Sequence, residues 1–224
     1  MTATLHVLRV FVDADDRHGN PLGVFLDGSA IAPDDRPGVA AELGFSETVF
    51  VDDARTGRSR IYTPGRELPF AGHPAVGTAW LLADVGMPVD ELHLVAGIVP
   101  TWAEGDLRWV RARPEWIHPI TLAELSSAAA VEALDGPPDG EPSWYPWAWR
   151  DESQGTIRSR YFAGAVGIAE DEATGAAAVL ITARLERDLE ILQGRGSRLS
   201  TRFEIDGAVE LGGRVVLDET RPYG

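Results

Sequence analysis

"RELPFAGHPAVGTAWLLADVG", residues 66–86, joins a run of polar and turn-forming residues to a segment that is apolar on nearly every side. A helix with that pattern needs burial all round, as it would have inside a curled sheet. Gly72, His73 and Pro74 stand at its start, where the backbone N–H groups have no intrahelical partner. The stretch predicts a buried helix over 74–85 whose N-terminus suits an anionic or enolising ligand.

A second stretch, "GIAEDEATGAAAVLITARL" at 167–185, has the same character. Aligning 72–79 on 170–177 without gaps places His73 opposite Asp171 and Gly77 opposite Gly175. A strand ending near Tyr62 or Tyr161 precedes each copy. The repeat predicts two similar lobes whose helix starts face each other, with polar residues of each copy beside a shared ligand.

Composition limits the classes of function. The chain of 224 residues carries a net charge of −15 and shows no basic patch, which argues against binding to nucleic acid or to anionic membranes. It has no apolar run of signal-peptide or membrane-spanning length, so we expect a cytoplasmic protein. Cysteine is absent, and the other histidines share no ligand-like spacing with His73. No metal site is predicted.

A coarse interpretation of the chain gives alternating strands and helices. It predicts a strand over 5–13, further strands within 91–112, a hairpin turning at 153–155, and helices over 33–44 and 121–134. Prolines make 135–147 loop-like. The expected divisions are an N-terminal lobe over 1–112, an interlobe segment over 113–148, and a C-terminal lobe over 149–224.

Five motifs in order resemble the PhzF family, named for a phenazine-biosynthesis isomerase and similar in fold to diaminopimelate epimerase. They are "GNPLGVFLD" (19–27), "LGFSETVFV" (43–51), "YTPGRELPFAGHPAVGTAWLL" (62–82), "EDEATGAAA" (170–178) and "LQGRGSRLS" (192–200). The resemblance implies an α+β fold of two pseudo-repeated lobes, each a barrel-like, mostly antiparallel sheet around a central helix. It also implies a cofactor-free active site in the cleft and a homodimer.

The resemblance also implies the site. It makes Glu47, in Ser46-Glu47-Thr48, the acid/base group, with His73 and Asp171 as further catalytic residues. The substrate-binding candidates are Asn20, Ser46, Gly72, Gly175 and Ala176. From the residues alone, Glu47 lies among apolar neighbours that would raise its pKa, although a lone glutamate in an alternating strand usually faces solvent.

The other candidates have structural alternatives. His73 before proline suits a cap or loop, Asp171 suits a helix N-cap, and Asn20 suits a turn. Ala176 departs from the family, which usually has serine there, and the interlobe segment is shorter than usual. The aromatic side chains of 144–149 either cover the second helix or form an exposed patch that pairs with another subunit.

These observations favour a cofactor-independent isomerase or epimerase that moves a proton on a small carboxylate-containing metabolite, with Glu47 as acid/base. The alternative is a non-catalytic relative that binds a ligand or forms oligomers. A dinucleotide-dependent dehydrogenase is disfavoured, because no G-x-G-x-x-G follows a strand and opens a helix.

Overall fold

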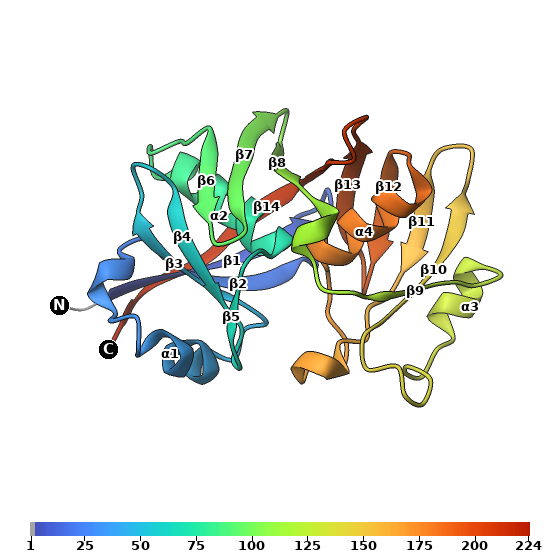
Figure 1. The fold of residues 1–224 in the computed structure, drawn as a ribbon, viewed down its shortest axis with the longest axis horizontal. Helices are drawn as coiled ribbons and strands as arrows, with labels where there is room; N and C mark the ends of the chain where they lie inside the picture. The colour runs from blue at the N-terminus through green and yellow to red at the C-terminus, as the bar shows by residue number, and fades with distance from the viewer. Residues whose placement is uncertain (1–2) are drawn as a thin grey trace.

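The computed structural model describes residues 3–224. Its strands pair side by side in one continuous sheet, and two helices pack against the inner faces of that sheet (Figure 1). The strands are β1 (Ala3–Val12), β2 (Asn20–Phe25), β3 (Thr48–Asp53), β4 (Arg58–Tyr62), β5 (Glu67–Leu68), β6 (Glu91–Leu94), β7 (Gly97–Glu104), β8 (Leu107–Ala112), β9 (Thr121–Glu124), β10 (Trp144–Asp151), β11 (Thr156–Ser159), β12 (Leu189–Gln193), β13 (Ser197–Phe203) and β14 (Val209–Tyr223). The helices are α1 (Arg36–Leu43), α2 (Gly72–Asp84), α3 (Ala128–Glu132) and α4 (Gly175–Leu185). Within residues 3–224, none of the helices combines the length and the apolarity that crossing a bilayer requires.

The N-terminal lobe is a closed barrel around α2. The ring runs β1-β2-β3-β4-β6-β7-β8-β14, and pairing of β14 with β1 closes it. α2 lies inside and contacts strands on all sides of the ring, with every residue from Gly72 to Ala79 buried. The expectation that this helix is buried all round is confirmed.

The C-terminal lobe is an open sheet against α4. Its order is β14-β13-β12-β11-β10-β9, and β9 pairs with β10 alone. Residues 113–120, which we call the strap, run between β8 and β9 and pass beside α4 in Figure 1. Trp116, Ile117 and Ile120 of the strap pack against the core that α4 shares. The α+β class with two pseudo-repeated lobes is confirmed, and a strap stands on the side that the shortened sheet leaves open.

β14 belongs to both lobes. Residues 209–213 pair with β8, and residues 209–212 also pair with β13, whereas residues 214–223 pair with β1. We propose that the chain divides into an N-terminal lobe over 1–112 and a C-terminal lobe over 149–224, with two changes. Residues 214–223 pair into the first barrel, and within the expected interlobe segment 113–148 residues 121–124 and 144–148 belong to the sheet of the second lobe.

The predicted helix over 121–134 is wrong in its first part. Thr121–Glu124 form β9, which pairs in parallel with Trp144–Trp147 of β10. This pairing outweighs the helix propensity of the segment. Ser127 then accepts a hydrogen bond from the backbone N–H of Ala130, so the short helix α3 starts only at Ala128.

The aromatic segment is strand rather than loop from Trp144 onward. Trp144, Tyr145 and Trp147 are buried, and the last two belong to the same core as the inner face of α4. Trp149 is half-buried against Trp147. The interpretation as core covering the second helix is therefore confirmed, and the exposed intersubunit patch is wrong for these side chains.

The starts of α2 and α4 are in contact. A β-carbon placed on Gly72 would lie 2.7 Å from the Cα atom of Gly175, closer than real β-carbons approach. The facing helix starts expected from the repeat are confirmed, but the register is wrong. Gly175 corresponds to Gly72 and not to Gly77, so Asp171 precedes α4 and is not the counterpart of His73.

Candidate active site

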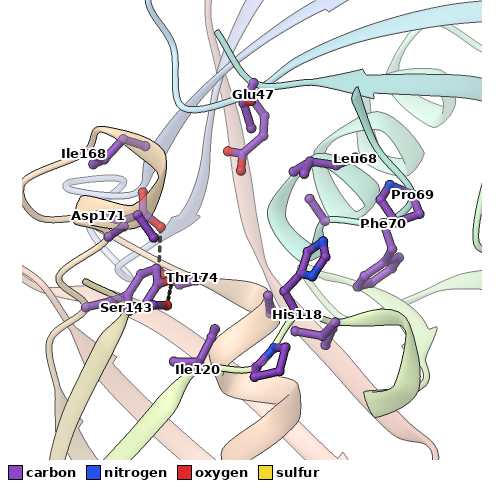
Figure 2. A pocket seen from close by; sticks show the side chains of 18 of the residues that line it. Glu47, Leu68, Pro69, Phe70, His118, Ile120, Ser143, Ile168, Asp171 and Thr174 are labelled. Atoms are coloured by element: carbon purple, nitrogen blue, oxygen red, sulfur yellow. Dashed lines mark hydrogen bonds between the residues drawn. The ribbon is translucent and has the colours of Figure 1, made fainter. Parts of the chain in front are cut away.

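A cavity of about 190 Å³ lies between the lobes, bordered by the N-cap residues of α2 and α4 (Figure 2). Most of its lining is apolar, and two carboxyl groups enter from different walls. Glu47 comes from just before β3, and Asp171 comes from the loop before α4. The lining residues are Glu47, Thr63, Arg66, Leu68, Pro69, Phe70, Ala71, Trp116, Ile117, His118, Pro119, Ile120, Ser143, Tyr161, Ala163, Ala165, Ile168, Asp171, Thr174 and Ala176.

Glu47 and His73 form a buried pair. The side chain of His73, the second residue of α2, is 4% exposed, and that of Glu47 is 16% exposed. His73 Nε2 lies 3.5 Å from Glu47 Oε2, and neither atom has a hydrogen-bond partner within the part of the chain that the structure describes. Buried polar atoms without partners are costly, and a bound ligand could satisfy those of this pair.

The protein environment raises the pKa of Glu47 and lowers that of His73. Burial, and next the negative charge of Asp171, raise the pKa of Glu47 to about 8, while a hydrogen bond from Ser46 acts the other way. Burial lowers the pKa of His73 to about 3, opposed by a hydrogen bond to the backbone of Pro21. At neutral pH the carboxyl carries a proton and the imidazole is uncharged, so Glu47 can exchange a proton near neutrality.

Asp171 is held by donors from both lobes. Asn20 Nδ2 donates to Asp171 Oδ1 at 2.8 Å, and the Thr174 hydroxyl donates to Oδ2. Burial raises the pKa of Asp171 to about 6, although the hydrogen bonds from Thr174 and Asn20 lower it. Asp171 therefore ionises before Glu47, and the two carboxyl groups differ in charge near neutral pH.

Gln193 supports this arrangement from behind. Its Nε2 atom donates to the carbonyl of Asp171 at 3.1 Å and to the Thr174 hydroxyl at 2.9 Å. The turn after it points the backbone N–H and the guanidinium of Arg195 at Glu172, at 3.0 and 2.9 Å. Arg195 is therefore paired with a carboxylate of the chain itself.

The two helix starts leave backbone donors near the cavity. The N-cap residues are Ala71 and Thr174, and neither caps its own helix with a side-chain hydrogen bond. The hydroxyl of Thr174 is directed to Asp171 instead. Uncapped N–H groups and the positive end of each helix dipole favour negative charge, such as that of an enolate.

The predicted site residues lie in two layers. Glu47, Asp171 and Ala176 line the cavity. His73 lies behind Glu47, and Asn20 lies behind Asp171. The hydroxyl of Ser46 lies 3.4 Å from Oδ1 of Asn20. Gly72 and Gly175 contact each other and are not among the lining residues.

Several residues in or directly behind the cavity were missed by the sequence analysis. Thr174 and Gln193 lie inside the quoted motifs, and their polarity beside Asp171 and Gly194 is the signal that could have found them. Tyr161 and Ser143, whose hydroxyls are 2.8 Å apart, and His118 lie outside those motifs, so the fold alone brings them to the cavity. Arg66 lies within the motif over 62–82, where its charge is the signal.

The chain is similar in sequence to proteins of a known family. The family model described as phenazine biosynthesis-like protein, PhzC-PhzF, matches residues 9–135. The trans-2,3-dihydro-3-hydroxyanthranilate isomerase of Pseudomonas aeruginosa is 32% identical over 281 aligned positions, which cover 96% of this chain and 98% of that protein. The alignment is longer than the chain, so that relative contains insertions that this chain lacks.

Solved structures share the fold along the whole chain. A PhzF family protein of Bacillus anthracis superposes with a TM-score of 0.81 at 19% identity, covering 100% of this chain and 99% of that one. A Pseudomonas aeruginosa protein described as a predicted epimerase gives 0.75 at 24% identity, covering 99% of each chain. At these identities the structures establish the two-lobed fold.

Proposed function

Because this chain belongs to the PhzC-PhzF family and is an isomerase, we propose that it moves a proton between carbon atoms of a small carboxylate-containing metabolite, with Glu47 as acid and base. The observation that carries the proposal is the pair of carboxyl groups, Glu47 and Asp171, which face one cavity with separated pKa values. Pairs of this kind are typical of acid/base sites.

Glu47 performs the transfer. Its ionised form removes a proton from the substrate carbon, and the protonated carboxyl returns that proton at a second carbon or on the other face. A pKa of about 8 makes the ionised form a stronger base than an ordinary glutamate, while keeping it accessible near neutral pH. His73 Nε2, 3.5 Å away, faces the proton while the carboxyl holds it.

The remaining residues stabilise negative charge on the substrate and orient the substrate in the cavity. Negative charge that develops on the substrate lies near the uncapped starts of α2 and α4. Asp171, fixed by Asn20 and Thr174, offers a carboxylate that accepts a hydrogen bond from a hydroxyl or ammonium group of the substrate. The chain supplies each of these groups itself, so the proposed mechanism includes no step through a metal or nucleotide.

The non-catalytic alternative has less support. A binding protein does not need a carboxyl group with a pKa near neutrality beside a second carboxylate, and such buried acids destabilise the fold. The shortened second lobe also leaves the cavity walled, because the strap contributes Trp116 to Ile120. Three relatives that carry an enzyme name are trans-2,3-dihydro-3-hydroxyanthranilate isomerases.

Proton exchange with solvent tests the proposal. The protein is incubated in heavy water with a panel of small carboxylates, beginning with trans-2,3-dihydro-3-hydroxyanthranilate, which the name of the relatives specifies. We expect product with deuterium at the reacting carbon, detected by NMR. Glu47→Gln keeps size and polarity but cannot exchange the proton, so turnover should fall about 10²–10⁴-fold.

Two controls accompany this experiment. His73→Ala should weaken substrate orientation as well as rate, and a chelator should leave turnover unchanged. Undiminished turnover by Glu47→Gln, or turnover abolished by the chelator, would show that the mechanism is wrong.

A homodimer and a cytoplasmic location stay predictions. The aromatic segment no longer supports a dimer, because its side chains are buried within the chain. The family resemblance supports the homodimer. Light scattering at micromolar concentration tests the homodimer, and a monomer would contradict it.

A further inference from the structure

Arg66 and His118 line the same cavity as Glu47 and Asp171, but neither lies in the proton-transfer machinery. Figure 2 shows His118 reaching in from the strap, across the cavity from Asp171. Among the lining residues that the structure describes, these two alone have side chains that can carry positive charge. Their position raises the question of what they bind.

The two acids of the cavity favour binding of an anionic group of the substrate at cationic donors away from them. A substrate carboxylate is repelled by ionised Asp171, and Glu47 must stay free to exchange its proton with the reacting carbon. Arg66 is always charged, and an imidazole presents an N–H in either tautomer, so both can donate to a carboxylate. Binding the anionic end at Arg66 and His118 leaves the carbon skeleton to face Glu47.

The backbone of Arg66 is fixed while its side chain has no partner. Thr63 Oγ1 accepts hydrogen bonds from the N–H groups of Gly65 and Arg66 at 3.2 and 3.1 Å, which holds the turn at the rim of the cavity. Arg66 is exposed, and within residues 3–224 its guanidinium makes no ion pair or hydrogen bond. Nearby Arg60 is instead paired with Glu67 at 3.2 Å. The guanidinium of Arg66 is therefore available to a ligand.

His118 is likewise presented by an anchored segment. The ring of Trp116 in the strap lies 5.5 Å from the ring of Phe70, and Ile117 and Ile120 pack against the core. Pro119 restricts the backbone beside the histidine. His118 itself is exposed and makes no side-chain hydrogen bond within the described part of the chain.

We propose that Arg66 and His118 are the specificity-determining pair that binds the substrate carboxylate and turns the reacting carbon toward Glu47. The substrate class rests on the proposed function, whereas the choice of residues rests on their place in the cavity. The strap that covers the open side of the second lobe thus also supplies part of the binding site.

Binding of benzoate and of benzamide, its uncharged counterpart, tests the pair by calorimetry at neutral pH. Arg66→Met and His118→Leu keep apolar bulk but remove the donors, and neither side chain supports the fold. Each variant should weaken benzoate binding about tenfold or more, as loss of a charge-assisted hydrogen bond does, and leave benzamide binding within about twofold. Arg58→Met, an exposed arginine on β4 outside the cavity, is the matched control and should bind both as the wild type does.

The inference is overturned if wild-type protein does not prefer benzoate to benzamide, or if a variant that carries both Arg66→Met and His118→Leu binds benzoate as tightly as the wild type. Glu47→Gln separates this result from the proposed function, because it should lose turnover and keep benzoate binding. If deuterium exchange fails while Arg66→Met loses benzoate, the proton-transfer mechanism is wrong and the carboxylate pair stands.

Discussion

Gly72 and Gly175 bring the N-termini of two helices from different lobes into direct contact, with room for a hydrogen atom and nothing larger on either α-carbon. The contact fixes the distance between the two helix starts. Ala71 and Thr174, which precede these glycines, border the cavity, so the same contact also fixes the spacing of these two lining residues.

Gly72→Ala and Gly175→Ala should therefore each destabilise the fold. The added methyl group would meet backbone atoms at 2.7–2.8 Å, so the helices must separate. We expect a loss of about 1–3 kcal/mol in the free energy of unfolding, measured in urea, as for other overpacked sites. Gly136→Ala, where no atom lies within 4 Å of the new methyl group, is the control, and an equal loss there would contradict the explanation.

The rate should follow the ionisation of Glu47. Because the reaction starts with the ionised carboxyl, whose pKa is raised to about 8, kcat/KM should rise about tenfold per pH unit below that value and level off above it. A pH profile between 6 and 9 checks this, with the apparent value belonging to the coupled pair of carboxyls. A rate that is flat or falls from pH 6 to 8 would mean that the protonated form begins the reaction.

Glu47 should also cost stability as pH rises. The folded state holds its proton up to about pH 8, whereas the unfolded chain releases it near the ordinary value of 4.5, so the stability present below 4.5 is lost on approaching pH 8. Relative to wild type, Glu47→Gln should gain about 2–4 kcal/mol in unfolding free energy between pH 5 and 8. Asp139→Asn, at an exposed loop position, should show no such gain.

Asn20 should act through Asp171. Asn20→Ala removes a donor to Asp171 and another to the carbonyl of Ala173, both at 2.8 Å. The pKa of Asp171 should rise further, and kcat should fall about tenfold or more, as for loss of a hydrogen bond to a charged group. Ser46→Ala removes the 3.4 Å contact to Asn20 and a hydrogen bond to Glu47 but no donor to Asp171, so it should leave the pKa of Asp171 unchanged. A rise in the pKa of Asp171 in Ser46→Ala as large as that in Asn20→Ala would contradict the role assigned to Asn20.

The fold and the inner site were predictable to different degrees. The apolar helix over 74–85 and the motif around Glu47 are local patterns, and the resemblance located His73, Asp171 and Asn20. The register of the repeat was wrong because small residues recur along both helices, so an alignment of letters does not show which glycines touch. Only the packed structure identifies Gly175 as the partner of Gly72.

Non-local pairing explains the other differences. Thr121–Glu124 resemble a helix in isolation, and become a strand because Trp144–Trp147 lie alongside. His118 and Arg66 are separated by the whole of α2 and four strands, and no motif joins them. Their common cavity depends on the course of the strap, which the sequence alone does not determine.

The double membership of β14 bears on how the protein is made. Ala3 at the start of β1 pairs with Tyr223 at the end of β14, so the first barrel lacks a wall until residues 214–223 have left the ribosome. The lobe that is synthesised first cannot finish folding first, and contacts this distant in sequence are slow to form. Truncating the chain after residue 213 should expose the interior of the N-terminal lobe, and a chaperone that shields the nascent chain would act on that lobe until residues 214–223 emerge.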